Sequence, residues 1–214
     1  ENIRFGLNSI KGVSEKSLQS LRDFRDSSTP TKYDIFLAAK QAGLNIGILS
    51  SLIQAGALGS KGDNRSLMVL EAQAFNLLTD REKRNFIALG EQYEYKLLNA
   101  IADAKSGDMV GDDGRPLMKE SRFQTFKRKY DPYKSIYDRN KKYEDFANWY
   151  FETQLLGYSH STRLKNVFPE QTAELNDSVY YNSMSENDSG RFIGVIEDAF
   201  KRTSRNGNKY IKLT

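Results

Sequence analysis

A short pattern of apolar residues near the start of the chain leaves few choices for the local fold. Between Leu7 and Leu21 the apolar side chains recur at positions 7, 10, 13, 18 and 21, around a single glycine, Gly12. Spacings of three residues within each half are typical of short helices. Gly12 falls where the chain must reverse, and glycine adopts the positive φ of such a turn without a steric penalty. The pattern therefore predicts two short helices joined by a tight turn.

The residues around this turn suit the binding of a phosphate group. The first turn of a helix carries unpaired N–H groups and about half a positive charge, so a phosphate can dock there while no base is read. Lys11 and Lys16 add point charges beside it, and Ser14 can cap the second helix. We therefore assign phosphate binding to Lys11, Gly12, Val13, Ser14 and Lys16. The segment resembles a helix-hairpin-helix motif, with Ser14 where that motif has a second glycine.

A second copy of the pattern follows between Leu49 and Leu67. An apolar helix ends at a glycine, and a new helix begins near residue 63 or 64 with two basic residues beside its N-terminus. The candidate DNA-binding residues of this copy are Gly56, Ala57, Lys61, Asn64 and Arg65. Tandem hairpins grip both strands of a duplex. A glycine-terminated helix followed by a capped helix also occurs in ordinary helical domains, so a purely structural role stays open for each copy.

Four patches, in order along the chain, resemble one protein family, the α subunits of bacterial DNA polymerase III, which are C-family replicative polymerases. Ile3–Ser17 is similar to the family's I-R-F-G-L-x-x-I-K-G-V-G-E pattern, and Leu49–Arg65 to its L-x-x-L-I-x-A-G-A-L/F-x-x-x-G-x-x-R pattern. Gln154–Ser159 resembles the E-L-L-G-F/Y-x-x-S stretch that precedes the family's OB-fold. Lys201–Thr214 resembles the first hairpin of that OB-fold. The shared order is more specific than any single patch.

The resemblance implies a mainly α-helical fold with a short C-terminal β-hairpin. It predicts a tandem helix-hairpin-helix DNA-binding domain over residues 1–75, a helical extension over 76–170, a linker over 171–190 and the truncated start of an OB-fold over 191–214. The extension is longer than the family pattern leads us to expect. Because the sequence stops inside what reads as a strand, we expect the chain to be a fragment of a longer polymerase.

The resemblance also implies a function. The family's catalytic carboxylates lie in a palm domain upstream of these patches, so we expect this chain to bind double-stranded DNA through backbone phosphates without catalysing polymerisation. The parent DNA-directed DNA polymerase would use Mg²⁺, whereas no cofactor is expected in this segment. Further expected partners are single-stranded DNA, the rest of the polymerase and other replication proteins. The alternative is a helical protein–protein interaction scaffold within a replication complex, without direct DNA binding.

A basic and aromatic segment lies in the part that matches no family pattern. Between Arg122 and Lys142 eight basic residues stand against two acidic ones, a net charge of +6. We assign DNA binding to Lys127, Arg128 and Lys129, because basic groups with interleaved rings suit single strands. The rings recur every three or four positions, however, which favours a buried helix face opposite a solvated cationic one. These aromatic residues are Phe123, Phe126, Tyr130, Tyr133 and Tyr137.

Composition excludes several classes of site. The 214 residues include no cysteine and one histidine, His160, which excludes a disulfide framework, a thiolate metal site and a zinc site with two imidazoles. The apolar runs fall short of the roughly 18 to 20 residues that span a membrane, so we expect a cytoplasmic protein without a membrane partner. Asp112 and Asp113 lack the rest of a calcium loop, which favours a turn. His160 lacks the partners of a catalytic triad, which favours a structural or exposed role.

Local signals also predict helix boundaries. Thr31 is a candidate N-cap, as is Thr79, which has Glu82 three positions later as in a capping box. From Thr79 the apolar spacing predicts one amphipathic helix that runs to Ala104.

In the second half of the chain, the spacing of apolar residues changes from a helical pattern to the alternation of strands. Residues 119–158 are helical in composition apart from a break at Pro132, because proline removes a helix N–H. Arg191–Phe200 and Lys209–Leu213 alternate as strands do, and the dipeptide Asn206-Gly207 between them is typical of a tight hairpin turn.

Overall fold

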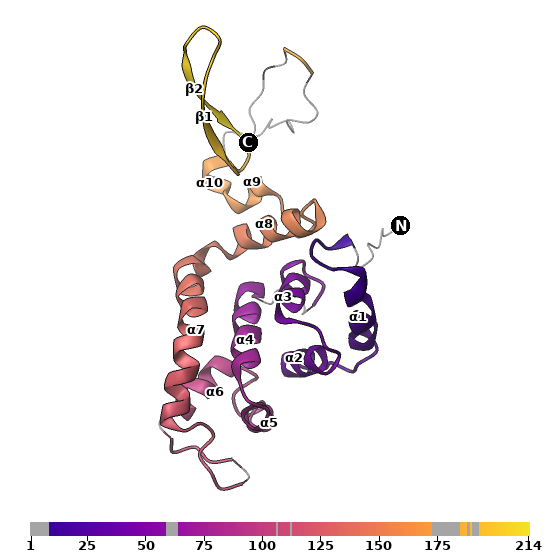
Figure 1. The fold of residues 1–214 in the computed structure, drawn as a ribbon, viewed down its shortest axis with the longest axis vertical. Coiled ribbons are helices and arrows are strands. Elements are labelled where there is room, and N and C mark those ends of the chain that lie inside the picture. The colour runs from indigo at the N-terminus through magenta and orange to yellow at the C-terminus, as the bar shows by residue number, and fades with distance from the viewer. Residues whose placement is uncertain are drawn as a thin grey trace. The chain divides into compact units, whose positions relative to one another are not determined.

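The computed structural model describes residues 9–58, 64–105, 107–111, 113–172, 185–187, 189 and 193–214. The chain divides into two compact units, Glu1–Ser161 and Thr162–Thr214. The first is built of α-helices, and the second carries two short helices and a two-stranded antiparallel sheet (Figure 1). The prediction of a mainly helical fold with a C-terminal β-hairpin is confirmed.

Five helices come first in the described residues, and the last three of them begin at side-chain caps whereas the first two do not. They are η2 (Glu15–Ser17), α1 (Leu18–Arg25), α2 (Lys32–Gln41), α3 (Ile46–Gln54) and α4 (Arg65–Leu77). The predicted cap Thr31 is confirmed, because its hydroxyl accepts from the N–H of Asp34 and the Asp34 carboxylate accepts from the N–H of Thr31. Asn45 and Asn64 cap α3 and α4 with their side-chain oxygens. These caps fix the starts of α2, α3 and α4 because they satisfy N–H groups that a helix leaves unpaired.

The helix predicted from Thr79 to Ala104 is in fact two helices, α5 (Asp80–Ala88) and α6 (Leu97–Ala104). The predicted capping box of Thr79 and Glu82 is confirmed. Between the helices, Glu94 and Tyr95 take positive φ values of 50° and 57°. Tertiary contacts outweigh the helical period here, because the Tyr95 ring packs edge-on against Tyr33 at 5.6 Å and the buried Glu71 carboxylate accepts from the first N–H of α6.

The break predicted at Pro132 is also wrong, since helix α7 (Glu120–Asn140) runs through that residue. A single missing N–H interrupts one hydrogen bond. Phe126 and Tyr130, which are 2% and 7% exposed, hold the helix against the core on the N-terminal side of the proline. Beyond Asn140, η3 (Lys141–Tyr143) leads into α8 (Glu144–Leu156).

Helix α4 lies at the centre of the first unit, and α3, α6, α7 and α8 pack against it (Figure 1). Its Ala72, Ala74 and Phe75 side chains are fully buried. Glu71 is buried among them, and its carboxylate binds the Lys32 ammonium at 2.5 Å and the N–H of Leu97 at 3.1 Å. A buried charge needs such partners because its desolvation is costly. The helix therefore positions the N-terminal hairpins relative to α7 and α8.

The second unit contains α9 (Leu164–Val167), α10 (Pro169–Thr172) and a β-hairpin of β1 (Ala199–Thr203) and β2 (Lys209–Leu213). Its first strand starts later than predicted, since residues 193–198 have no strand structure. Lys201 pairs with Ile211 at the middle of the register. Gly207 has the positive φ expected of it, 80°, in a loop that the N–H of Ser204 closes by donating to the carbonyl of Asn208.

Some predictions fall outside the described residues. They concern residues 3–8 of the first patch, Lys61, Asp112, most of the predicted linker and the start of the first predicted strand. The division into four parts stays a prediction, and its first boundary, after residue 75, falls inside α4. Within the described residues, no helix combines the length and apolarity that crossing a bilayer requires.

Candidate nucleic-acid interface

The first hairpin turns at Gly12, as predicted. Ile10 is buried, the N–H of Val13 donates to its carbonyl at 3.1 Å, and Gly12 between them has a φ of 92°. A Cβ built on Gly12 meets nothing within 4 Å. Backbone conformation rather than crowding therefore requires glycine at this position.

The turn presents unpaired backbone donors to solvent. Within the described residues, no acceptor is recorded for the N–H groups of Gly12, Ser14, Glu15 and Lys16. The side chains of Lys11 and Lys16 are exposed on either side, with Glu15 between them. The expected cap by Ser14 is absent, because its hydroxyl pairs with that of Ser17 at 3.1 Å. The corner can therefore donate several hydrogen bonds to one anion.

A backbone hydrogen bond anchors this hairpin to the last turn of α8. The N–H of Lys11 donates to the carbonyl of Leu155 at 2.9 Å. Helix α8 ends just beyond, at Gly157, which has a φ of 84° and donates to the carbonyl of Thr153. The Leu-Leu-Gly stretch at 155–157 thus supports the turn that carries the candidate phosphate donors.

In the second hairpin, the backbone N–H groups at the turn are already hydrogen-bonded within the hairpin. Helix α3 ends at Gly56, whose φ is 75° and whose N–H donates to the carbonyl of Ile53 at 3.0 Å. The N–H of Ala57 donates to the carbonyl of Leu52 at 2.9 Å, and together these bonds form a Schellman end. Asn64 caps α4 by accepting from the N–H of Leu67 at 2.6 Å. Gly56, Ala57 and Asn64 therefore lie at the predicted corner, but the N–H groups of Gly56 and Ala57 are already paired.

Acidic side chains of α8 occupy the start of α4. The Arg65 guanidinium donates to the Glu152 carboxylate at 2.5 Å and to the carbonyl of Gln54 at 3.3 Å. The N–H of Ser66 donates to a Glu144 oxygen at 3.1 Å. Arg65, a candidate phosphate ligand, is thus engaged within the protein, with 18% of its side chain exposed. Sequence patterns did not reveal either acid, because they lie 78 and 87 residues away from their partners, where no local pattern links them.

Glu152 is the most completely enclosed of these groups. It has no exposed surface, and besides Arg65 it accepts from the Ser159 hydroxyl at 2.8 Å and from the N–H groups of His160 and Ser161 at 2.8 and 3.0 Å. Burial by itself would raise the pKa of Glu152, but Arg65 and the serine donors outweigh it and hold this pKa at about 2. The His160 ring, which is 44% exposed, also lies beside this carboxylate, with its Nδ1 3.5 Å from a Glu152 oxygen.

The basic segment lies along α7. Lys127, Arg128 and Lys129 are exposed, as a DNA-binding role requires. Phe126 and Tyr130 are buried, which confirms the buried-face interpretation for the centre of the aromatic series, whereas Tyr133 is 44% exposed. Figure 1 places α1 and α7 on opposite sides of the first unit, with α3 and α4 between them. The structure therefore does not bring the first hairpin and the α7 cations together.

The weaker metal candidate forms a turn. Asp113 accepts two hydrogen bonds of 2.8 Å from the Arg81 guanidinium. This bidentate pair and the N–H of Arg115 hold the pKa of Asp113 well below its usual range. No group of three potential metal ligands occurs within the described residues.

A family model described as a helix-hairpin-helix motif matches residues 1–68. The matched segment is about a third of the 214 residues and contains both predicted hairpins. A search of curated proteins and a search of solved structures return no match. The motif suggests nucleic-acid binding and DNA as a partner, and it agrees with the exposed donors around Gly12.

Proposed function

We propose that the first unit binds double-stranded DNA without reading its sequence, by docking a backbone phosphate on the corner at Gly12. The observation that carries this proposal is the set of N–H groups of Gly12, Ser14, Glu15 and Lys16, for which the described residues supply no acceptor, together with the exposed side chains of Lys11 and Lys16. Such donors and charges recognise a phosphate irrespective of the bases beside it. The match of a helix-hairpin-helix family model to the same residues supports it.

The second hairpin has a smaller part in this proposal. Gly56, Ala57 and Asn64, at the end of α3 and the start of α4, remain candidates for contact with the DNA backbone, as does Lys61, which lies outside the described residues. Arg65 is left out, because releasing its guanidinium would leave the Glu152 carboxylate buried without its counter-charge. The α7 cations Lys127, Arg128 and Lys129 remain candidates for a separate nucleic-acid contact.

We further infer that the chain is a non-catalytic C-terminal segment of a DNA polymerase III α subunit. The four patches in family order support this, as does the occurrence of the matched motif family in DNA polymerase III α. The β1–β2 hairpin then corresponds to the start of an OB-fold. In this proposal Mg²⁺ serves the polymerase domain of the parent, and the rest of the polymerase and other replication proteins are further partners.

A fluorescence titration of a labelled duplex tests DNA binding. We expect a dissociation constant of about 10⁻⁴–10⁻⁶ M, and a log–log salt slope of about −3 to −4 if four phosphates are neutralised. Replacing Lys11 and Lys16 with alanine should weaken binding to all sequences alike and make the slope shallower by about 2.

The matched control for this titration replaces Arg84 and Lys105 with alanine. Both side chains are exposed. Arg84 lies in α5 and Lys105 directly follows α6, and both helices lie away from α8 in Figure 1. The control removes the same charge and should leave most of the affinity intact. If the unaltered protein shows no duplex binding at 50 mM salt, the proposal is wrong.

One observation favours the scaffold as a second candidate. Glu144 and Glu152 lie at the start of α4, where a second phosphate would otherwise dock, and they would repel it. The scaffold predicts a fully folded protein, by circular dichroism and cooperative unfolding, that binds no duplex in the same titration.

A further inference from the structure

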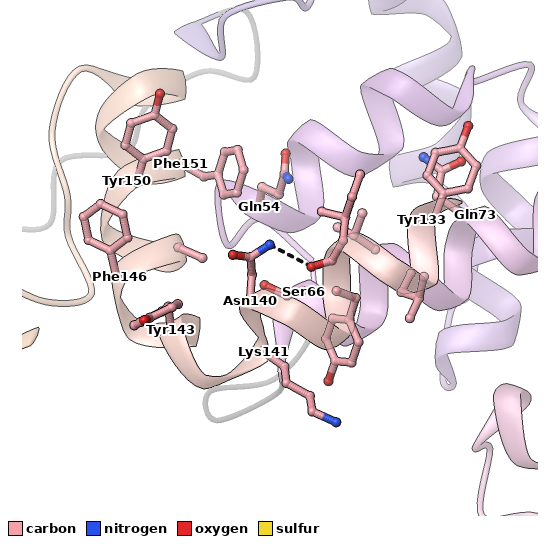
Figure 2. Close-up of a pocket in the computed structure, with 15 residues that line it drawn as sticks. Gln54, Ser66, Gln73, Tyr133, Asn140, Lys141, Tyr143, Phe146, Tyr150 and Phe151 are labelled. Atoms are coloured by element: carbon pink, nitrogen blue, oxygen red, sulfur yellow. Dashed lines mark hydrogen bonds between the residues drawn. The ribbon is translucent and has the colours of Figure 1, made fainter. Parts of the chain in front are cut away.

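An aromatic pocket lies between α4, α7 and α8, apart from the first hairpin. It has a volume of about 450 Å³. Figure 2 shows Tyr143, Phe146 and Tyr150 on one side of it and Tyr133 on the other, with Ser66 and Asn140 near the middle. This volume is in the range of small-ligand sites, which are mostly apolar with a few polar groups.

The polar groups of the pocket are mainly amides. Gln54, Gln73 and Asn140 line it. Asn140 donates to the carbonyl of Ile136 at 2.7 Å, the dashed line in Figure 2, which leaves its amide oxygen as an acceptor. No side-chain hydrogen bond is recorded for Gln54 or Gln73 within the described residues. An amide side chain offers a donor and an acceptor side by side, as the edge of a nucleobase does.

Helix α7 and η3, which line one side of the pocket, are rich in basic residues. From Lys127 to Lys142 seven basic residues stand against two acidic ones, a net charge of +5. Lys141 lines the pocket, and the Lys142 ammonium lies 4.8 Å from the centre of the Tyr143 ring. Asp138 neutralises part of this charge, because it pairs with Lys134 and Lys141. The remaining charge favours an anionic ligand that carries an aromatic or apolar group.

We propose that this pocket takes an unstacked base of a single-stranded nucleic acid. The rings supply stacking surfaces, the amides face the base edge, and the lysines neutralise adjoining phosphates. An acidic amphipathic peptide would satisfy the charge as well, but its apolar side chains would offer no partner to the amides of Gln54 and Gln73, which is unfavourable. The class of ligand rests on the proposed nucleic-acid function, whereas the pocket is a different site from the first hairpin. The first hairpin contacts Leu155 near the end of α8, whereas the pocket is lined by Tyr143 of η3 and by α8 residues between Phe146 and Phe151.

Trp149 makes the pocket open to direct measurement. It is the only tryptophan of the chain, and its ring stacks on that of Phe146 at 5.9 Å with an interplanar angle of 22°. A ten-residue oligothymidine should quench Trp149 fluorescence saturably. A strand of the same length with abasic sugars keeps every phosphate, and we expect it to bind about 5- to 140-fold more weakly, the range for one stacked base.

Two pocket variants and one control locate the effect. Tyr133→Ala changes a ring that is 44% exposed, and Gln73→Ala removes an amide on α4. Tyr133→Ala should reduce the preference for oligothymidine over the abasic strand by at least about fivefold, the loss of one stacking contact. Gln73→Ala should reduce it by about 2- to 12-fold, the loss of one hydrogen bond. Val110→Ala, at a side chain that is 60% exposed outside the pocket, should leave it unchanged. Thermal unfolding shows whether each variant is folded, and Gln73→Ala keeps the test valid if Tyr133→Ala is not.

The outcomes separate this proposal from duplex binding. Replacing Lys11 and Lys16 with alanine should weaken duplex binding. It should leave the preference for oligothymidine over the abasic strand unchanged. Equal affinity for the oligothymidine and abasic strands overturns the pocket proposal, even if the duplex still binds. The pocket proposal is also wrong if a fifteen-residue peptide of leucine and glutamate quenches Trp149 while oligothymidine does not, since the pocket is then a peptide site.

Discussion

Glu152 is a carboxylate without exposed surface, and a single guanidinium balances its charge. Arg65 supplies that guanidinium from the start of α4, while the serine and backbone donors come from residues 159–161 after α8. The group thus joins three segments of the chain. Such a pair gains little over apolar packing of the same volume, but the removal of one member leaves the other charged, buried and uncompensated.

We expect Glu152→Gln to lower the free energy of unfolding by about 3 kcal/mol, because Arg65 loses its counter-charge while the shape is kept. Urea denaturation measures the change. Glu94→Gln, at a side chain that is 76% exposed, is the matched control and should shift stability by less than about 0.5 kcal/mol. Equal effects of the two variants would show that the ion pair contributes nothing to the stability of the first unit.

The same carboxylate should make stability depend on pH. The pKa of Glu152 is about 2 when folded, below the value of about 4.3 for an unfolded chain, so its contribution is complete above about pH 5 and fades as the pH falls toward 2. The stability gap between the native protein and Glu152→Gln should shrink by roughly half between pH 7 and pH 3. Burial raises the pKa of Glu71, which acts in the opposite sense, but both proteins contain it and it cancels in the comparison. A gap that is constant in urea denaturation across this range would contradict the expectation.

At the scale of helices and turns, the corner at Gly12 carries both structure and function. Its φ of 92° is costly for any residue with a Cβ. Gly107 offers a matched comparison, because its φ is 76° and a Cβ there also meets nothing within 4 Å. The two glycines thus have the same conformational requirement in different places, and only one belongs to the hairpin.

We expect Gly12→Ala and Gly107→Ala each to destabilise the protein by about 1 kcal/mol, the cost of a left-handed conformation for alanine. Only Gly12→Ala should also weaken duplex binding, because the turn that presents the N–H groups is altered. The duplex titration and thermal unfolding of both variants check this. A similar loss of affinity in both would trace the effect to general stability.

Local signals predicted the parts of this fold that local energies decide. Thr31 and Thr79 cap helices as expected, since a cap depends on residues three positions apart. The division of α5 from α6 was missed because the buried Glu71 and the Tyr33 ring, which are distant in the sequence, decide it. The continuation of α7 past Pro132 was missed for a similar reason, because packing outweighs one lost hydrogen bond.

For the candidate site too, local features were predicted and contacts between distant segments were not. The turn at Gly12 followed from the spacing around it, and the structure has that turn. The engagement of Arg65 by Glu152 could not be predicted, because the period of a helix shows which residues share a face but not which helix packs there. The pocket was missed too, since residues from α3, α4, α7, η3 and α8 line it.

At the scale of the first unit, basic residues form two separate surfaces. The first hairpin and the α7 cations lie on opposite sides of α3 and α4 (Figure 1). Each can neutralise its own phosphates, so their contributions to salt dependence should be separable. This arrangement suits a protein that holds a duplex at one place and a single strand at another.

Replacing Lys127, Arg128 and Lys129 with alanine should make the salt slope for oligothymidine shallower by about 2, from three contacts at about 0.7 each. The duplex slope should change less than it does when Lys11 and Lys16 are replaced. Titrations of both ligands at 50 and 200 mM salt, with the unaltered protein and with each set of substitutions, measure the six slopes. If either set of substitutions changes both slopes alike, one continuous surface binds both ligands.

The hydrogen bond between Lys11 and Leu155 has a consequence for biosynthesis. The ribosome makes the glycine corner long before α8, and the corner lacks this backbone anchor until the end of α8 has emerged. Contacts between such distant residues form late in folding because a long intervening loop must first close. A nascent chain arrested before residue 155 should therefore carry an unanchored corner with little hold on nucleic acid, and full affinity should arise only once α8 is complete.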